Sequence, residues 1–165
     1  DTKEIDLTLG YTTGGFSISV TDYWFNGGPG YFHYGSHNTN HTFEAQIGYD
    51  FGPLTLNWYT NFAGTDGVNN EGDRAYSSYI SATVPFTLAG LEWTAEIGAT
   101  PWATDFYNYS EDPVCNGSNG FAVCDISLGA AKEIRITDSF SVPAFAKVTV
   151  NPRTEGAYFV FGLSF

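Results

Sequence analysis

The sequence has no methionine, only two cysteines, and 6 Lys and Arg against 18 Asp and Glu. The formal net charge of -12 repels a phosphate backbone, which excludes nucleic acid as the expected partner. No stretch approaches the roughly 20 apolar residues of a membrane-spanning helix. No G-x-S-x-G nucleophile motif occurs either, so we expect neither an enzyme nor a cofactor.

The first ten residues, "DTKEIDLTLG", contain neither an initiator methionine nor the basic and apolar regions of a signal peptide. This predicts a mature or clipped product. At 165 residues the chain is expected to form a single domain, spanning residues 1–165.

Aromatic residues make up 18% of the chain and glycine occurs 19 times, which favours a sheet over helices. Apolar and polar residues alternate along many segments, as in the closing "GAYFVFGLSF". This period of two predicts strands with one apolar face. We expect about nine, at residues 4–11, 15–23, 42–51, 54–62, 76–84, 91–99, 122–136, 140–150 and 156–165.

The connections between these strands alternate in length. Short links at 12–15, 52–53, 87–90 and 137–139 alternate with long polar ones at 26–41, 63–73 and 104–120. Outer-membrane barrels have short periplasmic turns and long extracellular loops, and aromatic residues near their strand ends. The pattern predicts an all-β, transmembrane, antiparallel up-and-down barrel in the lipid bilayer of a bacterial outer membrane. A soluble sandwich or a lipocalin-type barrel is the alternative.

The chain ends on Phe165 after alternating apolar residues, which is typical of the signal that barrel-assembly machinery recognises. If Phe165 is periplasmic, counting back places the first strand's start outside. Single-chain bacterial barrels usually have an even strand number with both ends periplasmic. We therefore expect the chain to lack N-terminal strands of a barrel of about 10–12 strands. A miscount by one strand is the alternative.

Four segments together resemble a known family: "TDYWFNGGPGYF", "RAYSSYISATVPF", "GATPWATDFYN" and "ITDSFSVPAFAKVTVNPRTEGAYFVFGLSF". They are similar to uncharacterised outer-membrane β-barrel proteins of the Bacteroidetes, and the likeness covers most of the chain. The resemblance implies a barrel in the outer membrane, with further strands upstream of Asp1. It implies no activity and no catalytic residues.

The polar positions of the strands would line the lumen of such a barrel. The predicted pore-lining residues are Glu44, Gln46, Asn57, Tyr59, Glu92, Glu96, Asp125, Arg135 and Lys147. Carboxylates on a pore wall attract cations, so a small porin-like channel is the expected function. Pairing of Glu92 or Glu96 with Lys147 or Arg135 would instead plug the lumen, leaving a structural or partner-binding subunit of an envelope complex.

Two loops carry candidate metal ligands. His33, His37 and His41 are evenly spaced, but their loop is rich in glycine and asparagine, which favours a solvated loop over a metal site. The segment "TDGVNNEGDR", which includes Asp66, offers oxygen ligands without the EF-hand spacing, so we interpret it as a polar loop tip.

The two cysteines, Cys115 and Cys124, flank the loop sequence "NGSNGFAV". A single close pair is typical of one local disulfide in an oxidising compartment such as the periplasm or cell surface. Two unpaired thiols are the alternative.

Overall fold

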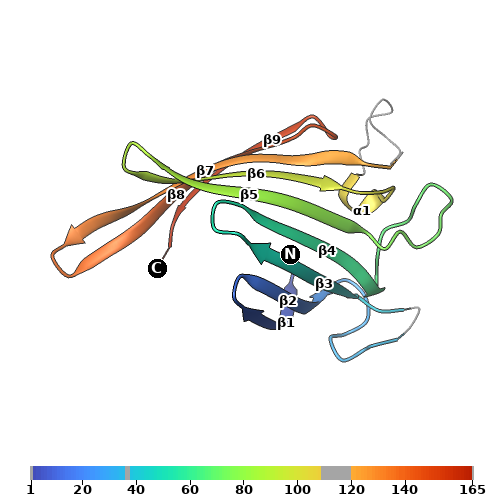
Figure 1. Ribbon diagram of the computed structural model, residues 1–165. Helices are drawn as coiled ribbons and strands as arrows, with labels where there is room; N and C mark the ends of the chain where they lie inside the picture. The colour runs from blue at the N-terminus through green and yellow to red at the C-terminus, as the bar shows by residue number, and fades with distance from the viewer. Residues whose placement is uncertain (1, 36–37, 109–119, 165) are drawn as a thin grey trace.

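The computed structural model describes residues 2–35, 38–108 and 120–164. They form one antiparallel sheet in which each strand pairs with the next along the chain (Figure 1). The strands are β1 (Glu4–Thr13), β2 (Phe16–Phe25), β3 (His41–Asp50), β4 (Thr55–Gly64), β5 (Ser78–Leu88), β6 (Leu91–Thr100), β7 (Ala122–Thr137), β8 (Phe140–Asn151) and β9 (Gly156–Leu163). A one-turn helix, α1 (Asp105–Asn108), lies between β6 and β7. The predicted all-β, up-and-down arrangement of nine strands is confirmed.

Two hairpins have the two-residue turn that suits the twist of antiparallel strands. Gly14 and Gly15 join β1 to β2 with φ of 53° and 88°, and Ala89 and Gly90 join β5 to β6 with φ of 53° and 74°. Turns with two positive φ angles favour glycine, so Ala89 is the one side chain in a strained position there. The β1–β2, β3–β4, β5–β6 and β7–β8 turns lie at one end of the sheet, whereas the long connections, α1 and the short β8–β9 connection lie at the other, at the right of Figure 1.

The two faces of the sheet differ in chemistry. The apolar face carries Leu7, Leu9, Tyr11, Ile18, Val20, Ile47, Leu56, Trp58, Val84, Phe86, Ile97, Ile126, Leu128, Val148, Phe159 and Phe161. The polar face carries Ser19, Thr21, Glu44, Gln46, Asn57, Tyr59, Asn61, Tyr79, Ser81, Thr83, Glu92, Glu96, Asp125, Ser127, Arg135, Lys147 and Thr149.

Burial is the reverse of that in a water-soluble domain. On the apolar face Leu9 is 82% exposed and Phe161 is 77% exposed, whereas on the polar face Asn61 is 1% exposed and Ser127 is 4% exposed. The only buried apolar residues in the described part of the chain are Ala75, Ala99, Cys124 and Val142. A soluble sheet of this kind would need a second layer over its apolar side, and the described residues supply none.

The sheet is open. β1 and β9 are its edges and do not pair with each other, so the described residues form an open sheet, and the predicted barrel is confirmed only as far as a nine-stranded antiparallel meander. The physical reason lies in strand parity. In a sequence of nine alternating strands the first and last run in the same direction and cannot form an antiparallel pair.

Among the described residues, no helix has both the length and the apolar character needed to cross a membrane.

Candidate functional site

The strand register brings all nine predicted lining residues to the polar face. Gln46 lies beside Tyr59, and Glu96 lies beside Ser127. Lys147 is paired with Gly129 on the same face. The sequence pattern therefore identified which residues share this surface, because alternation in a strand fixes the face on which each side chain lies.

Glu44 is the centre of a hydrogen-bonded group near the loop end of the polar face. The Tyr23 hydroxyl donates to Oε1 at 3.2 Å, and the Tyr107 hydroxyl donates to Oε2 at 3.3 Å. Tyr107 belongs to α1, so this contact holds the helix over the polar face. Burial raises the pKa of Tyr107 above its usual value, and the neighbouring Glu44 carboxylate adds to the shift, which keeps the phenol protonated as a donor.

Glu96 forms a second group nearer the middle of the sheet. The Tyr79 hydroxyl donates to its Oε1 at 3.3 Å, and the Thr83 hydroxyl donates to its Oε2 at 3.0 Å. Tyr79 lies directly over Gly98, where an added Cβ would overlap the phenol ring. Gly98 therefore provides the space that lets Tyr79 reach Glu96.

Other side chains of the polar face also form hydrogen bonds with one another. Ser19 donates to Gln46 at 3.0 Å, and the Gln46 amide donates to Asn57 and to Tyr59 at 3.3 Å each. The Ser127 hydroxyl is 2.6 Å from Asp125, to which it donates. The polar face is thus covered by hydrogen-bonded side chains rather than by isolated polar groups.

The ion pairs that would neutralise this face are not formed. In residues 2–35, 38–108 and 120–164, the ion pairs are His41–Asp22, Arg74–Asp66 and Arg135–Asp138. Arg135 pairs with Asp138 at 2.5 Å next to the β7–β8 turn. The cross-pairing of Glu92 or Glu96 with Arg135 or Lys147 is therefore absent from the described part of the chain, and Glu92 and Lys147 are exposed.

The segment around Asp66 is not a simple polar loop tip. The Asp66 side chain is 2% exposed, lies 3.6 Å from Arg74 Nε, and accepts hydrogen bonds from the Asn61 amide and the Ser77 backbone N–H. This loop is fixed to the start of α1, because Asp105 accepts from the Val68 N–H at 2.7 Å. No group of three metal-binding side chains occurs among the described residues.

His41 is likewise not part of a solvated loop. It begins β3, is 0% exposed, and lies on the apolar side of the sheet with Asp22. Its Nδ1 is 2.6 Å from Asp22 Oδ1, and its Nε2 is 2.6 Å from the Tyr31 carbonyl oxygen. The Tyr34 ring stacks on the imidazole with the centroids 4.1 Å apart. His37 lies outside the described residues, whereas His33 belongs to the loop that covers this pair.

Cys124 has a free, buried thiol, and its Sγ is 4.0 Å from the Gly98 carbonyl oxygen. It lies at the register shift between β6 and β7. Cys115 lies outside the described residues, as does Phe165. The predicted disulfide is thus not present in the structure.

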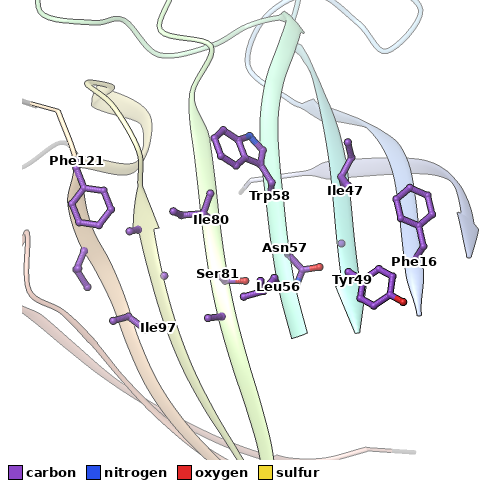
Figure 2. Close-up of a pocket in the computed structure, with 15 residues that line it drawn as sticks. Phe16, Ile47, Tyr49, Leu56, Asn57, Trp58, Ile80, Ser81, Ile97 and Phe121 are labelled. Atoms are coloured by element: carbon purple, nitrogen blue, oxygen red, sulfur yellow. The ribbon is translucent and has the colours of Figure 1, made fainter. Parts of the chain in front are cut away.

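The apolar face has a hollow of about 610 Å³. Figure 2 shows the side chains of Trp58, Ile80 and Phe121 around its loop-end half, with Leu56 and Ile97 further toward the turns. Trp58 also contacts Trp102 at its loop end, at a centroid distance of 5.7 Å. The residues that line this hollow are mostly apolar, like the rest of the apolar face.

Sequence reasoning missed Tyr107, Asp22 and the roles of His41 and Asp66. Only one of these had a visible signal: Asp22 interrupts the apolar alternation of "FSISVTDY" at an apolar position. The contacts of Tyr107 and Asp66 join segments far apart in the chain, so no local pattern identifies them.

Comparison with protein-family models, with curated proteins and with solved structures finds no match to this chain.

Proposed function

We propose that this protein is a bacterial outer-membrane β-barrel protein that forms a small, cation-preferring, porin-like channel. The observation that carries the proposal is the opposite chemistry of the two faces. The apolar face exposes large side chains such as Leu9 and Phe161, while the polar face is hydrogen-bonded and more buried. In a transmembrane barrel the first face meets lipid and the second surrounds water.

The hollow beside Trp58 supports this assignment. A depression of about 610 Å³ with a mostly apolar lining gives water few hydrogen-bond partners, whereas the acyl chains of a bilayer can fill it. Aromatic rings at its loop end, Trp58 and Trp102, suit the boundary between acyl chains and head groups.

Cation preference follows from the charges of the polar face. Glu44, Glu96 and Asp125 lie on it without an ion-pair partner among the described residues, and Glu92 is exposed on the same face. Carboxylates on a pore wall lower the energy of a passing cation and raise that of an anion.

Closure requires strands beyond those described. Because β1 and β9 run in the same direction, an odd number of further strands completes an antiparallel barrel. In the proposal these strands carry the same alternation, with polar residues inward and apolar residues toward lipid.

A second function, a plugged barrel that serves an envelope partner, is favoured by the loop-end contacts. Tyr107 reaches from α1 to Glu44, and Asp105 fixes that segment to the loop at Val68. Through these contacts the β4–β5 connection and the β6–β7 connection, which includes α1, lie over the loop end of the polar face. In a closed barrel they would narrow the opening of the lumen at that end.

The test has two stages. The detergent-purified protein is first run on a gel with and without heating, because folded barrels migrate differently from unfolded chains. It is then inserted into a planar bilayer under a salt gradient. Steady cation-selective steps are expected, with reduced selectivity for Glu92→Gln and Glu96→Gln. Glu71→Gln, in an exposed loop, removes the same charge away from the polar face and should leave selectivity unchanged.

The outcomes separate the two candidates. A heat-modifiable protein without conductance would eliminate the channel and leave the plugged barrel. A protein that stays soluble and monomeric without detergent would eliminate both.

A further inference from the structure

The connection between β2 and β3 is light blue in Figure 1. Its contacts with Asp22 and His41 place it on the apolar side of the sheet. Tyr31 contributes its carbonyl oxygen to His41, and the Tyr34 hydroxyl donates to Asp22 Oδ2 at 3.3 Å. The Trp24 indole donates to the Pro29 carbonyl at 3.3 Å. Trp24, Asp22 and His41 all occupy apolar-face positions of the register, next to Ile5, Leu7 and Phe43.

This loop covers His41–Asp22, the one ion pair that the described residues form on the apolar side. A charged side chain that faces hydrocarbon is costly unless it has an oppositely charged partner and is shielded from the lipid. Asp22 is 8% exposed and His41 is 0% exposed beneath Tyr31 and Tyr34. The loop therefore replaces the side chains of His41 and Asp22 on that surface with aromatic rings.

The loop and the last three residues of β2 before it carry no Asp, Glu, Lys or Arg, although the protein is strongly charged. Residues 23–40, "YWFNGGPGYFHYGSHNTN", contain no Asp, Glu, Lys or Arg, although the chain has 18 acidic and 6 basic residues of these types. The same stretch is rich in tyrosine, tryptophan and phenylalanine. Phe32 is 90% exposed and Tyr34 is 53% exposed. Uncharged, aromatic-rich surfaces are typical of the head-group layer of a bilayer, where rings have one apolar and one wet side.

We propose that this loop is a membrane-interface anchor, with Phe32 and Tyr34 seated in the head-group layer beside the loop end of β2 and β3. The inference rests on the proposed membrane function and adds a specific contact to it. The neighbouring loop differs, because Val68 at its tip is fixed to Asp105 on the polar side. The two loops leave the same end of the sheet, so they provide a matched comparison.

The test uses tryptophan quenching by phosphatidylcholine vesicles that carry bromine either near the carbonyl end or near the methyl end of the acyl chains. Variants each keep one tryptophan, with the other native tryptophans replaced by phenylalanine. The reporters are Phe32→Trp for the anchor, native Trp58 for the apolar face and Val68→Trp for the neighbouring loop. Folding of each is checked by its heat-dependent gel migration.

We expect Trp58 to lose emission in the brominated vesicles. Phe32→Trp should be quenched more by bromine near the carbonyl end, with emission shifted to the blue. Val68→Trp should be quenched by aqueous iodide and not by lipid. Adding His41→Ala, which removes the ring that the loop packs on, should reduce lipid quenching of the Phe32→Trp reporter.

Quenching of Trp58 without quenching of Phe32→Trp would overturn the anchor and leave the proposed function standing, with the loop free for an aqueous partner. Absence of quenching at both sites would overturn the anchor and the membrane location together. Equal lipid quenching of Phe32→Trp and Val68→Trp would also refute it. If Phe32→Trp does not fold, native Trp24, which contacts the loop at Pro29, serves as the reporter and carries the same expectation.

Discussion

Removing the Asp22 carboxylate should destabilise the protein strongly, although it lies on a face that is otherwise apolar. The Tyr31 carbonyl can only accept, so His41 Nε2 must carry a proton, and a second proton lies between Nδ1 and Asp22. Asp22→Leu leaves this second nitrogen without its partner under a loop that excludes water. Breaking a buried pair in this way costs about 3–5 kcal/mol.

The double variant isolates the pair. A leucine at position 22 is apolar like Leu7 and Phe43, which pair with Asp22 on the adjacent strands. The His41→Phe substitution keeps an aromatic ring that can stack on Tyr34. Replacing both partners with apolar groups of similar shape is far less costly than removing one. We therefore expect Asp22→Leu with His41→Phe to be more stable than the sum of the single variants predicts, by about 2 kcal/mol.

The measurement is reversible urea unfolding in detergent or vesicles, followed by tryptophan fluorescence. Asp6→Leu, at an exposed position of β1, makes the same chemical change and should alter the free energy of unfolding by less than about 0.5 kcal/mol. Single-variant effects that add to within about 0.5 kcal/mol in the double variant would refute the coupling, and with it the role assigned to the pair.

Three further predictions concern individual positions. Gly98→Ala should lower the free energy of unfolding by about 1–3 kcal/mol, because its Cβ overlaps Tyr79, and Tyr79→Ser should relieve much of that loss; an unchanged urea midpoint for Gly98→Ala would contradict the packing. Ala89→Gly should raise thermal stability, corresponding to about 1 kcal/mol, because Ala89 has φ of 53°, and a lower midpoint of heat-induced gel migration would argue against strain at this turn. The pKa of Tyr107 is higher in the folded protein than its value of 10.0 in the unfolded chain, so protonated Tyr107 stabilises the fold. This stabilisation is fully present at pH values below 10.0 and is lost as the pH rises through the pKa of the folded protein. The Tyr107→Phe variant should accordingly lose less stability than the wild type in alkaline solution, and identical pH profiles would count against this contact.

The polar face was largely predictable, and the loops were not. Gln46, Asn57 and Glu96 could be assigned to one face because a strand's alternation is a local property. The buried state of Asp66 depends on Asn61 and Ser77, which approach it only after β4 and β5 have paired.

The sequence by itself determined the nine strands, their meander order and which side chains share each face. These follow from the period of two and from the short and long connections, since each depends on neighbours along the chain. Only the tertiary structure decided that His41 and Asp22 pair beneath a loop on the apolar side, and that Tyr107 lies over Glu44. Those features depend on contacts between distant segments, which side-chain alternation does not encode.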